Sequence, residues 1–273
     1  MTEQKNIKTE IQNINDEAPL DKSDKRQPVI SVRHLVKIYK VGSETLAALN
    51  DVSMDVYQGD YIAVMGTSGS GKSTFMNIVG MLDVPTRGEY LFNGESVGNK
   101  NKVERAHLRR DNLGFVFQSF NLLSRTSAYD NVELPLIYSN IGASERKEKV
   151  EKALISVGLK EKMKNTPNML SGGQQQRVAI ARAIVNNPKM ILADEPTGNL
   201  DTRTSMEIIQ IFQELNDKGI TVVMVTHEDD IASTAKRKVI FKDGKMRSSE
   251  EVKERLIASE QLKIIPKPEE LFV

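Results

Sequence analysis

The chain has 273 residues, enough for one large domain or two small ones, and 39% of them are hydrophobic and 27% charged, as in ordinary globular proteins. Its 38 basic and 37 acidic residues leave a formal net charge of +1, so bulk charge gives no indication of a nucleic-acid or anionic-membrane binder. The chain has no cysteine, which excludes disulfides, thiolate nucleophiles and cysteine-based zinc sites.

The first 28 residues are polar, rich in Lys, Asn, Asp and Glu, and end at Pro28. We expect a disordered tail here, because so few apolar residues cannot offset the entropy lost on ordering. The segment has no apolar core of the kind found in signal peptides. No apolar run elsewhere approaches the ~20 residues that span a bilayer. We therefore expect membrane association to require a partner or the surface of the chain.

The pattern of apolar residues changes at residue 29. Alternation predicts β-strands at residues 29–32 and 48–57. Residues 61–65 form a short continuous apolar run, which is typical of a buried parallel strand. A glycine-rich loop follows, then a helix at about residues 72–82 and a strand at residues 89–92.

A helical insertion is predicted between about residues 119 and 172. Residues 132–137 belong to a helical stretch, and residues 145–157 form a charged amphipathic helix that ends near Gly158. Beta structure resumes only beyond this segment.

The remainder alternates between helices and strands. Residues 174–185 and 202–215 are predicted to be helices, and residues 190–193 and 220–225 to be buried strands. A final hairpin is expected around residues 239–244. Strands that alternate with helices predict an α/β fold with a mostly parallel sheet.

A phosphate-binding loop is predicted where the sequence reads GTSGSGKST. Glycines let the backbone approach phosphates, successive N–H groups form an anion nest, and the following helix adds its positive dipole end. Lys72 is expected to neutralise phosphate charge and Ser73 to offer a hydroxyl to Mg²⁺. The alternative is a chance Gly/Ser-rich linker, but the loop follows a buried strand and opens a helix. The expected ATP-binding residues are Gly66, Thr67, Ser68, Gly69, Ser70, Gly71, Lys72, Ser73 and Thr74.

An acidic pair ends the strand predicted at residues 190–193. Asp194 is placed to hold Mg²⁺ through water, and Glu195 to polarise the attacking water as a general base. The alternative is that the two residues only open a turn before Pro196.

The segment LSGGQ at residues 170–174 resembles the signature of the ATP-binding cassette (ABC) family, and it continues as QQRVAIARAIVNNP. Serine and glycine at a helix N-terminus also form an anion site. The resemblance implies that this site faces the γ-phosphate bound by a second copy of the chain, so that two chains enclose two ATP molecules. The alternative is an ordinary helix cap. The expected contact residues are Ser171, Gly172, Gly173 and Gln174.

Four more residues match motifs of this family. The resemblance implies that Gln118 senses Mg²⁺ and the water, that His227 contacts the γ-phosphate, and that Asp201 lies in the loop that communicates between protomers. It also implies that Tyr39 stacks on adenine. Each match has a purely structural alternative. Gln118 would be a polar residue ending a strand and His227 a structural histidine. Asp201 would be a helix N-cap and Tyr39 a half-buried strand tyrosine.

The resemblance covers residues 29–246. It implies a P-loop NTPase fold of the ABC nucleotide-binding type, with a mostly parallel core sheet, an antiparallel β-subdomain and a helical subdomain at about 119–172. The polar tail (1–28) and a charged C-terminal tail (247–273) lie outside this module.

Within the family, four segments look like the macrolide-export and lipoprotein-release branch, of the MacB and LolD type. The segments are KVGSETLAALNDVSMDV, MNIVGMLDVPTRGEY, LRRDNLGFVFQSFNLL and DNVELPLIY.

The resemblance implies a Mg²⁺-dependent ATPase that acts as a homodimer and powers a transporter. Its partner would be a separate membrane permease with an extracytoplasmic domain, and the ATPase would sit at the cytoplasmic face of the membrane. The apolar run at residues 120–123 and the helix near 132–138 are candidates for contact with the permease, with ordinary core as the alternative.

Two other functions stay open at this point. The first is transmembrane mechanical signalling, as in the related cell-division ATPase. The second is an ABC ATPase acting on nucleic acid, which the single phosphate loop, the lack of sustained heptads and the balanced charge disfavour.

Overall fold

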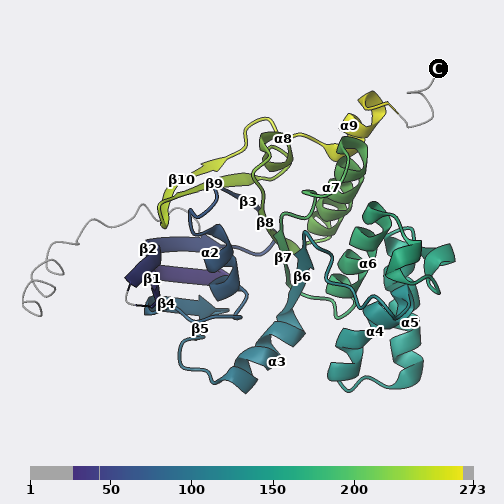
Figure 1. Cartoon of the computed structure of the whole chain (residues 1–273), viewed down its shortest axis with the longest axis horizontal. Helices are drawn as coiled ribbons and strands as arrows, with labels where there is room; N and C mark the ends of the chain where they lie inside the picture. Colours follow the sequence, from purple (N-terminus) through teal and green to yellow (C-terminus); the bar gives the residue numbers. More distant parts are fainter. Residues whose placement is uncertain (1–26, 43, 267–273) are drawn as a thin grey trace, which may run out of the picture.

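The computed structural model describes residues 27–42 and 44–266 (Figure 1). The expected tail, residues 1–28, lies outside the described residues except for its last two. Within the described part of the chain, no helix is both long enough and apolar enough to cross a bilayer.

The larger sheet carries the ends of the strands from which the site is built. Its order is β10-β9-β3-β8-β7-β6, and all strands but β10 run parallel. The expected mostly parallel sheet is therefore confirmed, and the carboxyl ends of its strands share one edge. The strands are β3 (Tyr61–Met65), β6 (Leu113–Phe117), β7 (Met190–Asp194), β8 (Thr221–Val225), β9 (Arg237–Lys242) and β10 (Lys245–Glu251).

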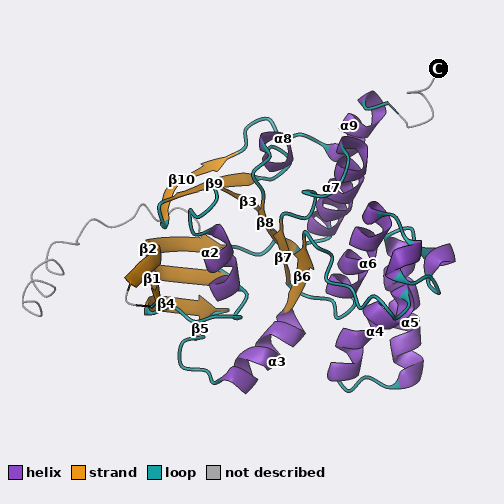
Figure 2. Ribbon diagram, viewed as in Figure 1, coloured by secondary structure: helices purple, strands orange, loops and turns teal. Residues whose placement is uncertain are grey.

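A second, antiparallel sheet has the order β2-β1-β4-β5. Helix α2 (Lys72–Val79) lies beside this sheet in Figure 2. The strands are β1 (Ile30–Val41), β2 (Glu44–Val56), β4 (Arg87–Phe92) and β5 (Glu95–Ser96).

Two hydrophobic cores occupy the two faces of the larger sheet. Strand β3 is buried along its whole length, and successive side chains point to opposite faces. Ile62 and Val64 therefore join α2 and the antiparallel sheet in one core, while Tyr61, Ala63 and Met65 join the helices of the other core. A strand covered on both faces needs a continuous apolar run, which residues 61–65 supply.

All the remaining helices but α3 contribute buried residues to the second core. Helices α4, α5 and α6 pack on one another, with α4 and α6 each begun by a capping box. The helices are α3 (Lys102–Asn112), α4 (Ala128–Tyr138), α5 (Ala143–Ser156), α6 (Gly172–Ile184), α7 (Thr202–Asp217), α8 (Asp229–Ala232) and α9 (Ala258–Ile264), with 3₁₀ turns η2 (Lys160–Lys162) and η3 (Pro167–Met169).

The structure adds helix α3, which the apolar pattern did not predict. Helix α3 has no buried residue, so it offers no apolar periodicity to read. The expected boundary at residue 246 falls inside β10, and residues beyond it continue as α9, which packs on α7.

Candidate functional site

The phosphate loop joins β3 to α2 and requires glycine at two positions. Gly66 has φ 146°, and a Cβ there would lie 2.2 Å from the Phe241 carbonyl oxygen. Gly71 has φ 103°, and its Cβ would lie 2.5 Å from the Ala48 carbonyl oxygen. Any other residue would combine an unfavourable backbone conformation with a clash. The loop is therefore held by β9 on one side and β2 on the other.

The loop presents donors suited to phosphate. Helix α2 starts after Gly71 without a side-chain cap, so its first N–H groups have no side-chain acceptor from the cap position. The Lys72 ammonium is nearly buried and donates to the carbonyls of Gly66 (2.7 Å) and Thr67 (2.9 Å). The buried Ser70 hydroxyl has no hydrogen-bond partner within the described residues. A buried cation, an uncapped helix N-terminus and an unsatisfied hydroxyl together fit a bound polyphosphate.

An acidic pair lies at the carboxyl end of β7. Burial raises the pKa of Asp194 and the charge of Glu195 raises it further, while Lys72 lowers it. Glu195 has φ 46°, in the left-handed region, and its N–H donates to the Val225 carbonyl (3.0 Å). A non-glycine residue held in that region stores strain, which is common at functional sites.

His227 follows β8 and faces the acidic pair. Its Nδ1 lies 3.4 Å from a Glu195 carboxylate oxygen. Because β7 and β8 are adjacent and parallel, both residues emerge at the same edge of the sheet. The expected catalytic pair is thus brought together in space from positions more than thirty residues apart.

Gln118 follows β6, the edge strand next to β7. Phe117 pairs with Asp194, so Gln118 lies one residue beyond the level of Asp194 at the sheet edge. Its side-chain N–H donates to Asn199 (3.4 Å), and the Asn199 amide donates to the Gln118 carbonyl (3.2 Å). Gln118, Asp194 and the Ser73 hydroxyl supply oxygen atoms of the kind that Mg²⁺ prefers.

The signature residues cap α6 and pack on the start of α7. Ser171 accepts a hydrogen bond from the Gln174 N–H (3.3 Å), and the Gln174 side chain accepts one from the Ser171 N–H (3.1 Å). A Cβ on Gly173 would lie 2.4 Å from Thr204 Cγ2. No hydrogen bond or ion pair among the described residues joins the signature to the phosphate loop of the same chain.

Asp201 is the N-cap of α7. Its carboxylate accepts from the Thr204 N–H (3.0 Å) and from the Thr204 hydroxyl (2.5 Å). These hydrogen bonds lower the pKa of Asp201. The capping role weighed in the sequence analysis is therefore present, and it fixes the Thr204 methyl against Gly173.

Tyr39 belongs to a cluster that the sequence did not reveal. Its hydroxyl donates to Asp83 (2.8 Å), and Lys37 lies 4.9 Å from its ring centroid and 2.7 Å from Asp83. Burial and Asp83 both raise the pKa of Tyr39, while a hydrogen bond with Thr74 lowers it. Asp83 lies 44 residues from Tyr39, so no local signal connects them. The half-buried ring is thereby fixed beside the end of the phosphate loop.

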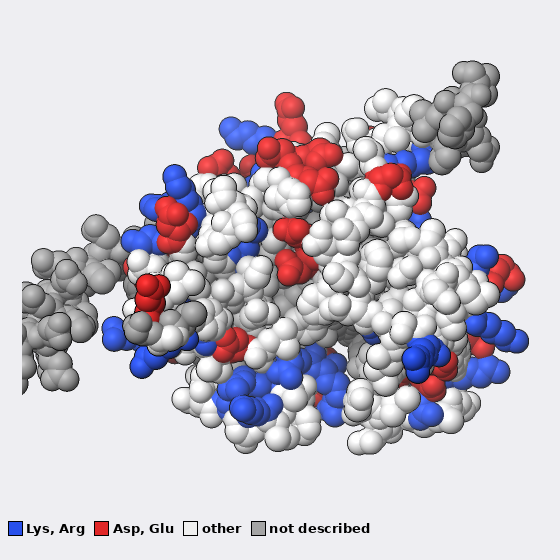
Figure 3. All heavy atoms as spheres, in the orientation of Figure 1, with Lys and Arg blue, Asp and Glu red and all other residues white. Residues whose placement is uncertain are grey.

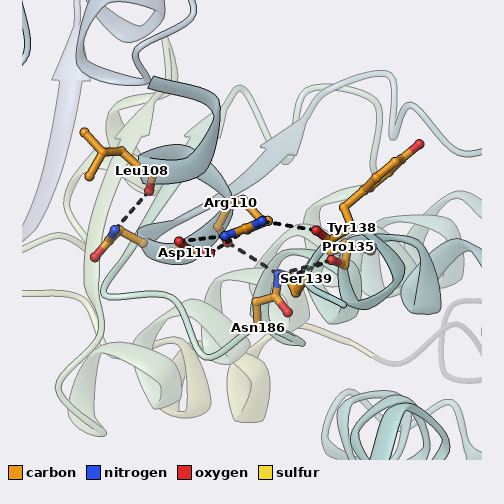
Figure 4. A network of polar contacts seen from close by, with 8 residues as sticks. Leu108, Arg110, Asp111, Pro135, Tyr138, Ser139 and Asn186 are labelled. Carbon is orange, nitrogen blue, oxygen red and sulfur yellow. Dashed lines mark hydrogen bonds and ion pairs between the residues drawn. The ribbon is translucent and has the colours of Figure 1, made fainter. Parts of the chain in front are cut away.

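A pocket of about 740 Å³ opens between α3, β6, α4 and α6. Arg110 crosses it, donating to the Tyr138 carbonyl (3.2 Å) and pairing with Asp111 (2.6 Å), while Asn186 bonds Ser139 (3.2 Å; Figure 4). Lys and Arg side chains gather over α3 in Figure 3. The lining residues are Leu82, Ala106, His107, Arg109, Arg110, Leu113, Gly114, Phe115, Phe117, Asn121, Leu134, Pro135, Tyr138, Arg182, Ala183 and Asn186.

A second contact missed from the sequence involves Arg182 of α6. Its guanidinium donates to the carbonyls of Phe120 (2.9 Å) and Asn121 (2.6 Å), which both have positive φ. Burial lowers the pKa of Arg182. The signature helix therefore holds the strained backbone that follows Gln118, a contact that only the tertiary fold creates.

A glycine-rich loop between a buried strand and a helix, with a lysine in the loop and an acidic pair at the end of another parallel strand of the same sheet, defines a P-loop nucleotide-binding ATPase. The family model described as ABC transporter matches residues 49–198. The chain belongs to the ABC transporter family, as an ATP-binding subunit that hydrolyses ATP.

Two relatives place the chain within this family. The ABC transporter ATP-binding protein YknY of Bacillus subtilis is 53% identical over 216 residues, which are 79% of this chain and 94% of YknY. The macrolide export ATP-binding/permease protein MacB of Bdellovibrio bacteriovorus is 50% identical over 222 residues, 81% of this chain and 34% of MacB. The chain thus spans about a third of that fused relative.

Among solved structures, the chain is similar to the ATP-binding cassette MJ0796 in a dimeric, post-hydrolysis state bound to ADP and Pi. The TM-score is 0.77 at 42% identity, covering 82% of this chain and 99% of that one. The expected ABC fold and the likeness to MacB-type proteins are both confirmed by these comparisons.

Proposed function

We propose that the chain powers a separate membrane permease of the macrolide, peptide or lipoprotein export type. The observation that carries this proposal is the likeness to proteins named for macrolide export, at 50% identity over most of the chain. YknY, of which the chain covers 94%, is named only as an ATP-binding protein, which supports a permease on another chain. Such a complex would hold this subunit at the cytoplasmic face of the membrane.

In this proposal the phosphate loop binds the ATP phosphates through its N–H groups and Lys72, and Tyr39 stacks on adenine. Ser73, Gln118 and Asp194 would hold Mg²⁺, which would supply positive charge to neutralise the phosphates. Asp194 and Gln118 lie at the same edge of the larger sheet, and Lys72 lies in the adjoining phosphate loop. This arrangement supports a single shared site.

Glu195 is proposed as the general base that accepts a proton from the attacking water. His227, 3.4 Å from the Glu195 carboxylate, is placed to contact the γ-phosphate while staying next to the base. The hydrogen bond that the Glu195 N–H donates to Val225 holds the strained backbone, so the carboxylate has a defined direction.

The second half of each site is proposed to come from another copy of the chain. Ser171, Gly172, Gly173 and Gln174 form a helix N-terminus that makes no polar bond to the phosphate loop in the described part of its own chain. Asp201 accepts a hydrogen bond from the Thr204 N–H, and the Thr204 methyl group packs against Gly173. The MJ0796 cassette, at 42% identity, is dimeric, which supports a dimer of this chain.

The pocket between α3 and α4 is the proposed contact surface for the permease. Val132 and Leu136, on the expected helix, are fully buried core residues. Leu134, Pro135 and Tyr138 of the same helix instead line the pocket, where Tyr138 is 66% exposed. The lining residues are mostly apolar and include Arg and His but no carboxylate. Such a lining fits an apolar helix with an acidic end.

The test is capture of the partner from detergent-solubilised membranes by tagged Glu195→Gln chain with ATP. We expect a stoichiometric multi-span permease with a large extracytoplasmic domain. Tyr138→Glu, at the pocket, should reduce recovery of the permease at least tenfold, because binding would then bury a charge against an apolar surface. Ile155→Glu, which is 51% exposed on α5, is the matched control and should leave recovery unchanged.

Two results would contradict the proposal. Recovery of soluble or nucleic-acid-bound proteins alone would remove the permease. Equal loss of the permease with Tyr138→Glu and Ile155→Glu would remove the pocket as the contact surface. A complex of the captured permease with the wild-type chain that hydrolyses ATP without moving any export substrate would instead favour mechanical signalling.

A further inference from the structure

The segment after β10 is bound to the turn that follows α8. The Val252 N–H donates to the Lys236 carbonyl and the Leu256 N–H to the Ser233 carbonyl, both at 2.9 Å. The Arg255 Nε donates to the Thr234 carbonyl (2.6 Å). Helix α8 begins two residues after His227, so this contact reaches the helix that directly follows the histidine.

A single buried amide joins this segment to α7. Gln213 is 6% exposed, and its Nε2 donates to the carbonyls of Thr234 (3.1 Å) and Leu256 (2.8 Å). Its Oε1 accepts from the Ala258 N–H (2.9 Å). Three elements therefore meet at one side chain, and losing it would leave buried backbone groups without partners, which is costly.

The end of α9 is fixed to the start of α7. Arg203 donates from Nη1 to the Ile265 carbonyl (2.6 Å), a cation placed at a helix C-terminus. On its other side Arg203 lies 3.7 Å from Glu207, which pairs with Arg177 of α6 (3.0 Å). Arg203 is two residues from Asp201, so α9 is connected to the loop that precedes α7 and to the signature helix.

The same segment also touches the strand that leads into the phosphate loop. The Arg255 guanidinium lies 5.4 Å from the ring centroid of Tyr61, the first residue of β3. Tyr61 is 1% exposed, so this contact is made inside the core. Residues 252–265 are therefore built into the domain (α9 lies against α7 in Figure 1) and contact the supports of three site loops.

We propose that residues 252–265 act as a C-terminal clamp, which fixes α7 and α8 relative to each other and so positions Asp201 and His227 for hydrolysis. Arg203 and Gln213 are its positioning residues, since neither contacts the proposed nucleotide site. The inference rests on the roles proposed above for Asp201 and His227. Nucleotide binding depends on the phosphate loop and Tyr39, so the clamp should influence turnover more than binding.

The test compares Arg203→Ala, Gln213→Leu and wild type for KM and kcat of ATP hydrolysis by the purified full chain. We expect kcat to fall by about ten- to a hundredfold, the order of loss that a small misplacement causes, with KM changed less than about twofold. Arg203→Lys keeps a donor for the Ile265 carbonyl and should recover most of kcat. Lys263→Ala, an exposed position on α9, is the matched control and should match wild type.

Arg203 is about four-fifths buried at the edge of the core, so Arg203→Ala is expected to fold even if Gln213→Leu does not. Folding is checked by circular dichroism at the assay temperature. Wild-type kcat in folded Arg203→Ala would overturn the inference, as would a KM increase that accounts for the whole loss. A membrane-capture failure would leave this result readable, because the assay contains no permease.

Discussion

Asp194 is half-buried at the end of β7, and burial together with Glu195 raises its pKa. The charged carboxylate is therefore disfavoured in the folded chain relative to an unfolded pKa of about 3.9. The resulting loss of folding stability is complete at a pH above the pKa of Asp194 in the folded chain. It disappears at a pH below the pKa in the unfolded chain. Stability is thus lowered at neutral pH to keep a charge next to Lys72.

Replacing the charge tests this cost. Asp194→Asn should raise the Tm of the nucleotide-free chain at pH 8, where each 1 kcal/mol corresponds to about 2–4 °C for a domain of this size. The gain should shrink as the pH falls through the raised pKa of Asp194 toward the unfolded value of about 3.9, because the wild-type carboxylate is then increasingly protonated. Calorimetry across this pH range measures it. An Asp194→Asn chain that melts at or below the wild-type temperature at pH 8 would refute the argument.

Glu195 carries the proposed base, and its removal should separate binding from turnover. Glu195→Gln keeps the size of the side chain but cannot accept a proton, so kcat should fall by about 10²–10⁴-fold while ATP still binds. Turnover is measured by phosphate release and binding by calorimetry. Asp229→Asn neutralises a nearby exposed acid and should keep wild-type kcat. Turnover near the wild-type rate in Glu195→Gln would sink the base assignment.

At this scale the sequence predicts residue identity better than residue environment. The phosphate loop and the acidic pair were predicted because each needs fixed residue types at fixed spacing. The left-handed backbone of Glu195 and the Lys37–Asp83 support of Tyr39 were not, since both arise from contacts between distant segments.

At the scale of elements, the close approach of α6 to α7 depends on a missing side chain. A Cβ on Gly173 would lie 2.4 Å from Thr204 Cγ2 but 3.8 Å from Thr204 Cβ. Asp201 holds Thr204 in place through two hydrogen bonds, so the methyl cannot easily turn away. The signature loop and the loop before α7 are therefore fitted to each other.

A double substitution tests this fit. Gly173→Ala should lower the free energy of unfolding by about 1–3 kcal/mol through overpacking. Adding Thr204→Ser removes the clashing methyl and should restore most of that loss, since alanine is itself favourable in a helix. Urea unfolding of the two single variants and the double variant measures the coupling. Purely additive effects would show that the two side chains do not meet.

Element predictions succeeded where an apolar face is buried and failed where none is. Helices α6 and α7 bury regular stripes and were found within a few residues of their ends. Helix α3 buries no residue, so no apolar stripe marks it in the sequence. The capping box at Asn101 marks its start instead. The hydrogen bonds that Arg203 and Gln213 of α7 make to α9 and the residues around it carry no signal in sequence.

The whole molecule is half of a proposed pair. The strand ends of the parallel sheet gather Asp194, Glu195, His227 and Gln118 beside the phosphate loop. The signature residues face elsewhere, with no polar bond to that loop within the described residues. The sequence predicts both the phosphate loop and the signature residues, and the fold leaves them without a polar bond to each other in the part of the chain that the structure describes. The likeness to a dimeric cassette supports their meeting across two copies of the chain.

The central claim is that ATP is enclosed between two copies of this chain. The most direct measurement is the mass of Glu195→Gln by light scattering with and without Mg-ATP. The account predicts a monomer without nucleotide, twice that mass with ATP, and a monomer again when Ser171→Arg is added to a chain that still binds ATP. A Glu195→Gln chain that binds ATP and stays monomeric would contradict it.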